Sequence, residues 1–306
     1  MSDVGEQPVG EVWTPLKILS WAVPFLKEKG VETPRLDVEC LLADVLGCDR
    51  LRVYLQYDRP LSSDERTKLR DGVGRRARRE PLAYILGGRE FFGHLFTVGP
   101  GVLIPRPESE MLVEEAVEVL NALPEEDRTV LDLGTGSGCL ALSLALAVPG
   151  ARVWAVDFSP EALSIARRNA ELLNVLSQVQ FRRGSWFDAL REGDPDRFSV
   201  VVCNPPYLTS QDWAVLSPEI SQYEPLSALQ GGEDGLEAYR ALRVGLSSRL
   251  TSGGWAFLEL NANLSGKTED LFADWTRRNI LPDLQGLPRV LSLQAPSSLD
   301  SPLQGV

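Results

Sequence analysis

One stretch of this sequence has residue types and spacing that point directly to chemistry: Asn204, Pro205, Pro206 and Tyr207. It follows an apolar run, residues 198–203, that is rich in valine and typical of a strand covered on both faces. The prolines end that strand and hold Asn204 and Pro205 in extended geometry. The Asn204 side-chain oxygen and the Pro205 carbonyl then offer two hydrogen-bond acceptors beside the ring of Tyr207, which suits a planar NH2 group. Taken alone, a Pro-Pro dipeptide more often indicates a turn with a buried tyrosine.

A glycine-rich loop lies upstream, between an expected strand that ends at residue 133 and an expected helix over 139–147. Its glycines allow a close approach of the backbone to a ligand, but their spacing lacks the pattern of dinucleotide-binding folds. An acid at the start of the loop would repel a pyrophosphate, yet it suits the ammonium group of an amino acid, such as the methionine part of S-adenosylmethionine. The loop supplies these candidate cofactor-binding residues: Asp132, Gly134, Thr135, Gly136, Ser137 and Gly138.

Three further residues complete the candidate cofactor site. Asp157 stands at the end of the next expected strand, residues 152–156, and a carboxylate there can accept hydrogen bonds from both hydroxyls of a ribose. For Asp157 alone, an acid that begins a helix is an equal alternative, and its position after the glycine loop favours the cofactor. Trp186 follows the third expected strand and could cover an adenine, with a place in the core as the alternative. Asn204 is counted with both the cofactor and the substrate.

Strands and helices alternate from residue 129 onward, and these are the elements that must position the motifs. The alternation predicts an α/β fold, a doubly wound and mostly parallel sheet of the Rossmann-like type. Expected strands end at 133, 156, 182, 203 and 260, expected helices span 139–147, 160–173 and 236–250, and residues 284–293 are expected to close the sheet as an antiparallel hairpin.

A small helical domain precedes the sheet. Thr14 and Gly30 bound a first expected helix, a second ends at Gly47, and a third spans residue 62 to about residue 79 and closes on a basic run that complements the helix dipole. Between residues 81 and 105, glycines separate short expected strands, which predicts a hairpin that links two domains. We therefore divide the chain into 1–80, 81–105, 106–294 and a loose tail, 295–306, and expect residues 1–12 to be disordered.

Composition argues against several classes of function. The 31 basic and 43 acidic residues give a net charge of −12, which opposes direct binding of nucleic acid. The single histidine, His94, and four cysteines without metal-ligand spacing lead us to expect no metal. The acidic start carries no apolar signal segment, and no apolar run is long enough to span a membrane. We expect a cytoplasmic protein that acts as a monomer.

With these motifs in place, the sequence resembles the class I S-adenosylmethionine-dependent methyltransferases. Within them it is similar to the protein-(glutamine-N5) methyltransferase family that modifies peptide chain release factors, from about Leu36 to Arg289. Asn-Pro-Pro-Tyr alone is shared with adenine and guanine amino-methyltransferases, so the other stretches are more specific. The resemblance rests on Pro81-Leu-Ala-Tyr-Ile-Leu-Gly87, Leu103-Ile-Pro-Arg-Pro-Glu-Ser-Glu110, the glycine loop, Asn204-Pro-Pro-Tyr207, Glu224-Pro225 and Gly231-Gly-Glu-Asp-Gly-Leu236.

The resemblance implies an activity and the parts that carry it. Such an enzyme transfers a methyl group from S-adenosylmethionine to the side-chain amide nitrogen, N5, of the glutamine in a Gly-Gly-Gln motif of the release factor. It implies a helical substrate-recognition domain over 1–80, a linking hairpin over 81–105 and a methyltransferase domain over 106–294. It also implies cofactor binding by Gly134 to Gly138, Asp157 and Trp186, and substrate binding by Asn204, Pro205, Pro206 and Tyr207, with Asn204, Pro205 and Tyr207 catalytic.

The sequence departs from the family pattern at three places. Ser109 stands where threonine is usual and keeps the hydroxyl group. Residues 259–264 read Glu-Leu-Asn-Ala-Asn-Leu where Glu-Ile-Gly with a following glutamine is usual. The family pattern therefore does not predict the backbone conformation of this segment. The tail after Arg289 has no counterpart in the family pattern.

Two other functions remain as alternatives. The first is an N-methyltransferase that acts on an exocyclic amino group of an RNA or DNA base, favoured by the Asn-Pro-Pro-Tyr motif, the basic run Arg75–Arg79 and the pair Arg182-Arg183. The net charge of −12 opposes this function. The second is a non-catalytic nucleotide-fold binding module, which requires a purely structural explanation of every motif at once.

Overall fold

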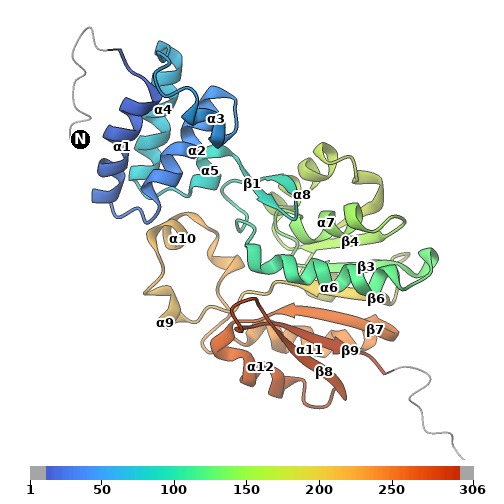
Figure 1. Cartoon of the computed structure of the whole chain (residues 1–306). Helices are drawn as coiled ribbons and strands as arrows, with labels where there is room; N and C mark the ends of the chain where they lie inside the picture. The colour runs from blue at the N-terminus through green and yellow to red at the C-terminus, as the bar shows by residue number, and fades with distance from the viewer. Residues whose placement is uncertain (1–11, 297–306) are drawn as a thin grey trace, which may run out of the picture. The chain divides into compact units, whose positions relative to one another are not determined.

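The structure is a computed structural model that describes residues 12–296 (Figure 1). Contacts within the chain divide these residues into two units. The first unit runs to Gly87 and includes Pro218–Tyr223, and the second comprises Gly88–Ser217 and the chain from Glu224 onward. Most of the predicted disordered start, 1–12, and most of the predicted loose tail, 295–306, lie outside the described residues. Ala295, the first residue of that tail, is buried, and its amide donates to the Gly254 carbonyl at 2.9 Å.

The first unit is a group of helices around its own apolar core, and it confirms the predicted helical part of the fold. Thr14 begins the first helix because its hydroxyl accepts a hydrogen bond from the Lys17 amide. Gly47 ends the second helix in the left-handed conformation that glycine adopts readily. Ser62 and Glu65 form a capping box at the start of α4. The helices are α1 Pro15–Glu28, α2 Pro34–Leu46, α3 Arg50–Tyr54, α4 Ser63–Ala77, α5 Leu82–Leu86 and α10 Pro218–Tyr223.

A cluster of ion pairs joins α10 to the other helices of this unit. Arg76 is 6% exposed, and its side chain lies 2.6 Å from Asp37 and 2.9 Å from Glu219. Arg79 donates two further hydrogen bonds to Glu219, of 2.7 and 2.6 Å. A charge that is buried without a partner is strongly destabilising. The sequence predicted that the basic residues at the end of α4 complement the helix dipole. In the structure, two of them, Arg76 and Arg79, also connect α10 to α2 and α4 through ion pairs.

The segment before Gly87 is helical, where the sequence predicted short strands. Helix α5, Leu82–Leu86, begins after Pro81 and ends at Gly87, whose φ is 73°. Leu82 and Ile85 pack against the core of the first unit. A helix of five residues is too short to show a 3.6-residue apolar period, and so packing decided its conformation.

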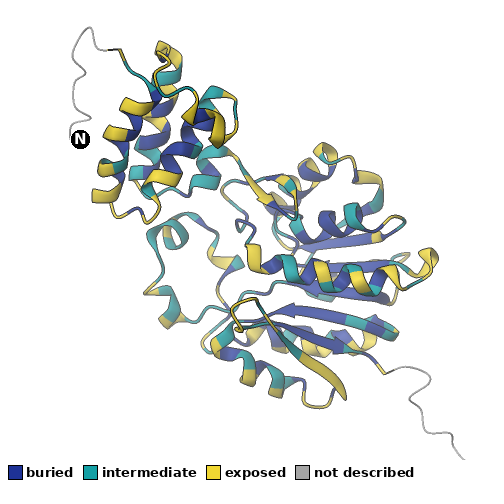
Figure 2. Cartoon of the chain, viewed as in Figure 1, coloured by how far each residue is buried: buried dark blue, intermediate teal, exposed yellow. Residues whose placement is uncertain are grey.

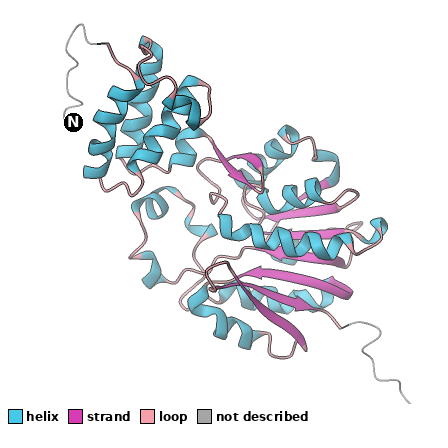
Figure 3. Cartoon of the chain, viewed as in Figure 1, coloured by secondary structure: helices cyan, strands magenta, loops and turns pink. Residues whose placement is uncertain are grey.

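The second unit contains a seven-stranded sheet in the order β5-β4-β3-β6-β7-β9-β8. Figure 3 draws the strands in magenta. The pairs from β5 to β7 are parallel, and β9 pairs antiparallel with both β7 and β8. This topology confirms the predicted doubly wound, mostly parallel fold. The strands are β3 Thr129–Leu133, β4 Arg152–Asp157, β5 Val179–Arg183, β6 Phe198–Cys203, β7 Leu250–Glu259, β8 Arg277–Pro282 and β9 Pro288–Gln294.

Residues of the central strands alternate between the two faces of the sheet. In β6, Val200 and Val202 belong to one core cluster, and Val201 and Cys203 belong to the other. Because both faces are buried (Figure 2), the strand forms a continuous apolar run in the sequence. Helices α6 Glu110–Asn121, α7 Cys139–Ala147 and α8 Pro160–Leu172 cover the first face, and α11 Glu237–Arg249 and α12 Ser265–Leu271 cover the second.

Two hairpins belong to the second unit. The predicted linking hairpin is present as β1 Gly88–Phe91 and β2 His94–Thr97. The closing hairpin is also present, but its first strand, β8, ends at Pro282, so the predicted span 284–293 holds only the turn and the second strand. The sequence did not reveal β8 because that strand has no buried residue and begins with polar side chains. Among the helices described between residues 12 and 296, none is long and apolar enough to cross a membrane.

Candidate active site

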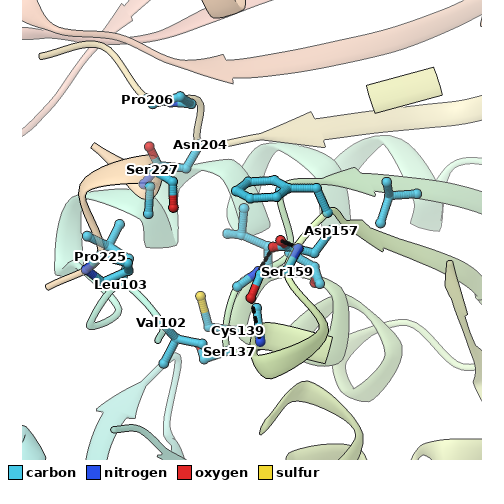
Figure 4. Close-up of a pocket in the computed structure, with 18 of the residues that line it drawn as sticks. Val102, Leu103, Ser137, Cys139, Asp157, Ser159, Asn204, Pro206, Pro225 and Ser227 are labelled. Carbon is cyan, nitrogen blue, oxygen red and sulfur yellow. Dashed lines mark hydrogen bonds between the residues drawn. The ribbon is translucent and has the colours of Figure 1, made fainter. Parts of the chain in front are cut away.

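The strand order changes direction at β3, and the candidate site lies there. β3 pairs in parallel with β4 on one side and with β6 on the other. The carboxyl ends of all three strands therefore meet at one edge of the sheet, where such folds bind ligands. The glycine loop follows β3, Asp157 ends β4 and Asn204 follows β6. Figure 4 shows Asn204 on one side of the resulting pocket and Asp157 on the other.

The glycine loop turns back over the end of β4. Gly134, Gly136 and Gly138 all have positive φ, of 78°, 56° and 84°, which other residues rarely adopt. The amides of Gly134 and Thr135 both donate to the Val156 carbonyl at 2.9 Å. Residues 134–137 of the loop line the pocket, so their backbone is open to close approach by a ligand, whereas the predicted Gly138 is not in the lining.

Asp157 lines the pocket and also holds the glycine loop. Its Oδ2 accepts a hydrogen bond from the Gly136 amide at 2.9 Å, and its Oδ1 accepts one from the Ser159 amide at 2.9 Å. Ser159 caps α8, so the alternative role of Asp157 at a helix start also holds. Burial raises the pKa of Asp157, while the backbone amides lower it. Each carboxylate oxygen has a second lone pair, which can accept a hydrogen bond from a ligand hydroxyl.

Asp132 lies beneath the loop and not in the lining of the pocket. Its side chain is fully buried, and Oδ2 accepts hydrogen bonds from the Thr135 hydroxyl at 2.7 Å and the Ala141 amide at 3.2 Å. Burial raises the pKa of Asp132 to about 7. The structure therefore places Asp132 as an anchor that ties the loop to α7, and it does not bring the carboxylate to the pocket surface.

Asn204 lines the pocket and is held by two successive hydrogen bonds. Its Nδ2 donates to the Ser109 hydroxyl at 3.1 Å, and Ser109 in turn donates to Oε2 of Glu259 at 2.5 Å. Both Ser109 and Glu259 are 2% exposed. Burial raises the pKa of Glu259 to about 7. Because Nδ2 is engaged, Oδ1 of Asn204 is the atom that can accept a hydrogen bond from a ligand.

The rest of the Asn-Pro-Pro-Tyr motif is divided between pocket and core. Pro206 lines the pocket, whereas Pro205 is buried behind it. Tyr207 packs against the core cluster that includes Tyr239 and Leu264, and burial raises the pKa of its hydroxyl. Asn204 and Pro206 thus lie in the lining of the pocket and Pro205 and Tyr207 do not, so the predicted contacts of Pro205 and Tyr207 with the substrate stay a prediction.

Gly231, the first residue of the downstream motif Gly231–Leu236, contacts the backbone of the Asn-Pro-Pro-Tyr loop. Its amide donates to the Leu208 carbonyl at 2.8 Å, and the Leu208 amide donates to the Leu229 carbonyl at 2.8 Å. A Cβ atom at Gly231 would lie 2.6 Å from the Cα of Tyr207 and 2.8 Å from the carbonyl oxygen of Pro206. Only a glycine allows these two backbones to approach so closely, and their contact holds the Asn-Pro-Pro-Tyr loop from outside the pocket.

Two aromatic side chains line the pocket: the predicted Trp186 and the unpredicted Phe158. Trp186 also packs against the core, so both of its proposed environments are present. Phe158 is 54% exposed and directly follows Asp157. Because Phe158 is adjacent in sequence to Asp157, a predicted cofactor-binding residue, the sequence did contain a signal that Phe158 lies near the site.

An ion pair that the sequence did not reveal also borders the pocket. Arg106 lines it and donates to Glu224 at 2.5 Å, and Glu224 also accepts from the Ile104 amide at 3.1 Å. Arg106 and Glu224 lie within two stretches that carried the family resemblance. Their roles were invisible there because the two residues are 118 positions apart.

Comparison with known proteins identifies the family. Residues 17–87 match the family model for the PrmC N-terminal domain, and residues 109–219 match the methyltransferase small domain. The release factor glutamine methyltransferase of Geobacter sulfurreducens is 43% identical over 286 residues, which are 92% of this chain and 96% of that protein. The chain belongs to the release factor glutamine methyltransferase family. The member from Koribacter versatilis is 38% identical over 90% of this chain and 97% of its own length.

Membership of the release factor glutamine methyltransferase family confirms the predicted enzyme class. The fold also resembles the crystal structure of the hMettl16 catalytic domain in complex with a MAT2A 3'UTR hairpin, with 18% identity and a TM-score of 0.51 over 67% of this chain and 76% of that one. Within residues 12–296, no group of three or more His, Cys, Asp or Glu side chains is placed to hold a metal ion. The expectation that no metal is required stays a prediction.

Replacement of Gly231 by alanine tests the support of the Asn-Pro-Pro-Tyr loop. The new methyl group would meet backbone atoms of Tyr207 and Pro206, which cannot move aside as a flexible side chain can. We expect Gly231→Ala to displace the loop and to lower the methyltransferase kcat by on the order of a hundredfold. The matched control is Gly266→Ala, because a Cβ atom at Gly266 meets no atom within 4 Å. Equal activity of both variants would show that the contact at Gly231 does not position the loop.

Proposed function

We propose that this enzyme transfers a methyl group from S-adenosylmethionine to N5 of the glutamine in the Gly-Gly-Gln motif of peptide chain release factors. The observation that carries the proposal is the orientation of Asn204, whose Nδ2 is engaged by Ser109 while its oxygen is left to accept. An acceptor suits the N–H groups of a substrate amide. The names of the relatives, which are release factor glutamine methyltransferases, support the same substrate.

The residues of the pocket fit S-adenosylmethionine. Gly134 and Gly136 offer backbone without side chains, and Asp157 offers carboxylate oxygens with spare lone pairs for ribose hydroxyls. Ser137 lines the pocket and its hydroxyl is buried without a hydrogen-bond partner among the described residues, so a polar ligand atom could satisfy it. Trp186 and Phe158 offer apolar surface for an adenine. When bound, S-adenosylmethionine supplies an activated methyl group on a sulfonium.

The protein groups act on the amide nitrogen by positioning and by charge. An amide nitrogen is a poor nucleophile because its lone pair is delocalised, so it must be held in line for methyl transfer. Oδ1 of Asn204 and the carbonyl of Pro205 are proposed to accept the two amide N–H groups. These hydrogen bonds strengthen as positive charge develops on the nitrogen, which favours the transition state over the ground state. Tyr207 is proposed to pack on the amide plane. Methyl transfer leaves S-adenosyl-L-homocysteine as the product, and the amide proton then passes to solvent.

The two basic features that favoured a nucleic-acid substrate are largely paired with acids. Arg76 and Arg79 contact Glu219, and Arg182 makes two hydrogen bonds to Asp194, of 2.8 and 2.5 Å. These pairs lower the positive potential available to a phosphate backbone. We therefore keep release factors as the proposed partners and assign substrate recognition to the helical domain. Because translation termination takes place in the cytoplasm, we propose the enzyme acts there, as a monomer.

The direct test is methylation of a purified release factor with labelled S-adenosylmethionine. Label should enter the intact factor and not a factor in which the Gly-Gly-Gln glutamine is replaced by alanine. Mass spectrometry of the glutamine-containing peptide should place the methyl group on N5. Label on both factors would mean that the enzyme methylates a residue other than this glutamine. If RNA or DNA is added to the assay and it alone takes up label, the alternative substrate is supported.

Replacement of Asp157 by alanine tests the cofactor site. We expect Asp157→Ala to weaken S-adenosylmethionine binding by about 1.5–3 kcal/mol for each ribose hydrogen bond lost, because the acceptor is charged. Additional loss is expected because the Gly136 amide would lose its partner. Isothermal calorimetry measures the affinity, and circular dichroism checks the fold. Unchanged affinity would remove Asp157 from the cofactor site.

Replacement of Asn204 by alanine tests the acceptor. If its hydrogen bond forms chiefly in the transition state, Asn204→Ala should lower kcat on the order of a hundredfold and change the affinity for S-adenosylmethionine much less. Steady-state kinetics with release factor separate the two effects. A normal kcat with only a raised KM for release factor would mean that Asn204 binds the ground state and the transition state alike, against the mechanism proposed here.

A further inference from the structure

We propose that Ser109 and Glu259 are positioning residues that decide which end of the Asn204 side-chain amide faces the substrate, and that they do so only while Glu259 is ionised. This inference rests on the proposed function, because it concerns the acceptor that holds the glutamine amide. It adds a pH-dependent control of that acceptor by two residues remote in sequence.

The hydroxyl group of Ser109 connects three parts of the chain by hydrogen bonds. Ser109 ends the 3-10 turn Pro107–Ser109, Glu259 ends β7 and Asn204 follows β6. The Ser109 oxygen lies 2.5 Å from Oε2 of Glu259 and 3.1 Å from Nδ2 of Asn204. Ser109 and Glu259 are both 2% exposed, so solvent does not compete for these bonds.

The direction of each bond follows from the chemistry of the groups. An ionised carboxylate can only accept, so the single hydroxyl proton of Ser109 must point to Glu259. The Ser109 oxygen can then only accept from Asn204, which must present Nδ2 to it. Oδ1 of Asn204 is thereby directed away from Ser109, as an acceptor for the substrate amide. The carboxylate thus determines the amide orientation without touching the substrate.

Protonation of Glu259 removes this constraint. A protonated carboxyl group can donate to Ser109, which frees the hydroxyl proton of Ser109 to point at Asn204. Asn204 can then turn its amide over and present Oδ1 to Ser109, so that Nδ2 faces the substrate. Two N–H donors would then face each other at the reacting nitrogen, and the acceptor that favours the transition state would be lost.

The surroundings of Glu259 put its titration in the physiological range. Burial raises the pKa of Glu259 to about 7, and the negative charge of Glu108 raises it further. The hydrogen bond from Ser109 and the positive charges of Arg289 and Arg106 act in the opposite direction and lower this pKa. Other titratable groups that interact with it are Tyr207, Tyr239, Cys203 and Cys139. Burial raises the pKa of each of them, so they stay neutral while Glu259 titrates. Since the active form is the carboxylate, kcat should fall as pH drops through about 7.

Asp132 must be separated from this effect, because burial raises its pKa to about 7 as well. It lies under the glycine loop, so its protonation should act on cofactor affinity. Measurement of kcat at saturating S-adenosylmethionine removes that contribution and leaves the effect of Glu259.

The experiment measures kcat and KM for release factor between pH 6 and 8.5 in the full-length enzyme and three variants. In the wild type, kcat should fall below pH 7 with a slope that approaches tenfold per pH unit. Glu259→Gln should have a lower kcat that no longer changes with pH in this range, because its amide does not titrate. Ser109→Ala should lower kcat by about tenfold through loss of the bond to Asn204, and Ser109→Thr should retain most of the activity because it keeps the hydroxyl.

Ser143→Ala is the matched control. Ser143 is fully buried and its hydroxyl has no hydrogen-bond partner among the described residues, so its removal repeats the loss of a buried hydroxyl away from the pocket. Calorimetry with S-adenosylmethionine at pH 8 should give the same affinity for all variants, which shows that each is folded. A variant that fails this check is replaced by Glu259→Asp, whose shorter carboxylate should lower kcat but keep the pH slope.

Two results would overturn the inference. One is a Glu259→Gln enzyme with the pH profile of the wild type, and the other is a Ser109→Ala enzyme with unchanged kcat. Failure of the proposed function is a separate outcome, because the wild-type enzyme would then transfer no methyl group to release factor at any pH.

Discussion

Parallel pairing of β3 with both β4 and β6 is the constraint on which the site depends. It brings three chain segments to one edge of the sheet, although Leu133, Asp157 and Cys203 are far apart in sequence. Hydrogen bonds from Gly134 and Thr135 to the end of β4 then bind the loop of one strand to the backbone of the next. The position of the pocket is therefore set by the strand pairing, and the side chains that line it determine which ligand can bind.

Buried polar groups connect this edge to the surrounding segments. Asn169 of α8 bonds both backbone groups of Thr97, at 2.8 and 3.0 Å, and the Ser137 carbonyl at 2.9 Å, so one amide joins the linking hairpin to the glycine loop. Ser109 and Glu259 join the segment before α6 to the end of β7. A buried polar group left without its partner costs about 1–3 kcal/mol, so each link resists rearrangement. Through the link at Ser109, a change of charge at Glu259 can act on Asn204.

Much of the fold could be predicted because its signals are local. The caps at Thr14 and Ser62, the stop at Gly47 and the valine-rich run of β6 are each contained in a few residues, and the structure has them where the sequence indicated. The errors fell where local signals are weak. Helix α5 is too short for periodicity, and the polar strand β8 gains its conformation from pairing with β9.

The sequence by itself determined which chemistry the chain carries, since the glycine loop, Asp157 and Asn204 are recognisable from residue type, spacing and place at strand ends. Only the tertiary structure decided how those groups are used. It buried Asp132 beneath the loop, turned Asn204 by way of Ser109 and Glu259, and paired Arg76 and Arg79 with Glu219. Ser109 and Glu259 are 150 positions apart, and Arg79 and Glu219 are 140 apart. No periodicity or motif spans such separations, because hydrogen bonds act over about 3 Å of space and not along the chain.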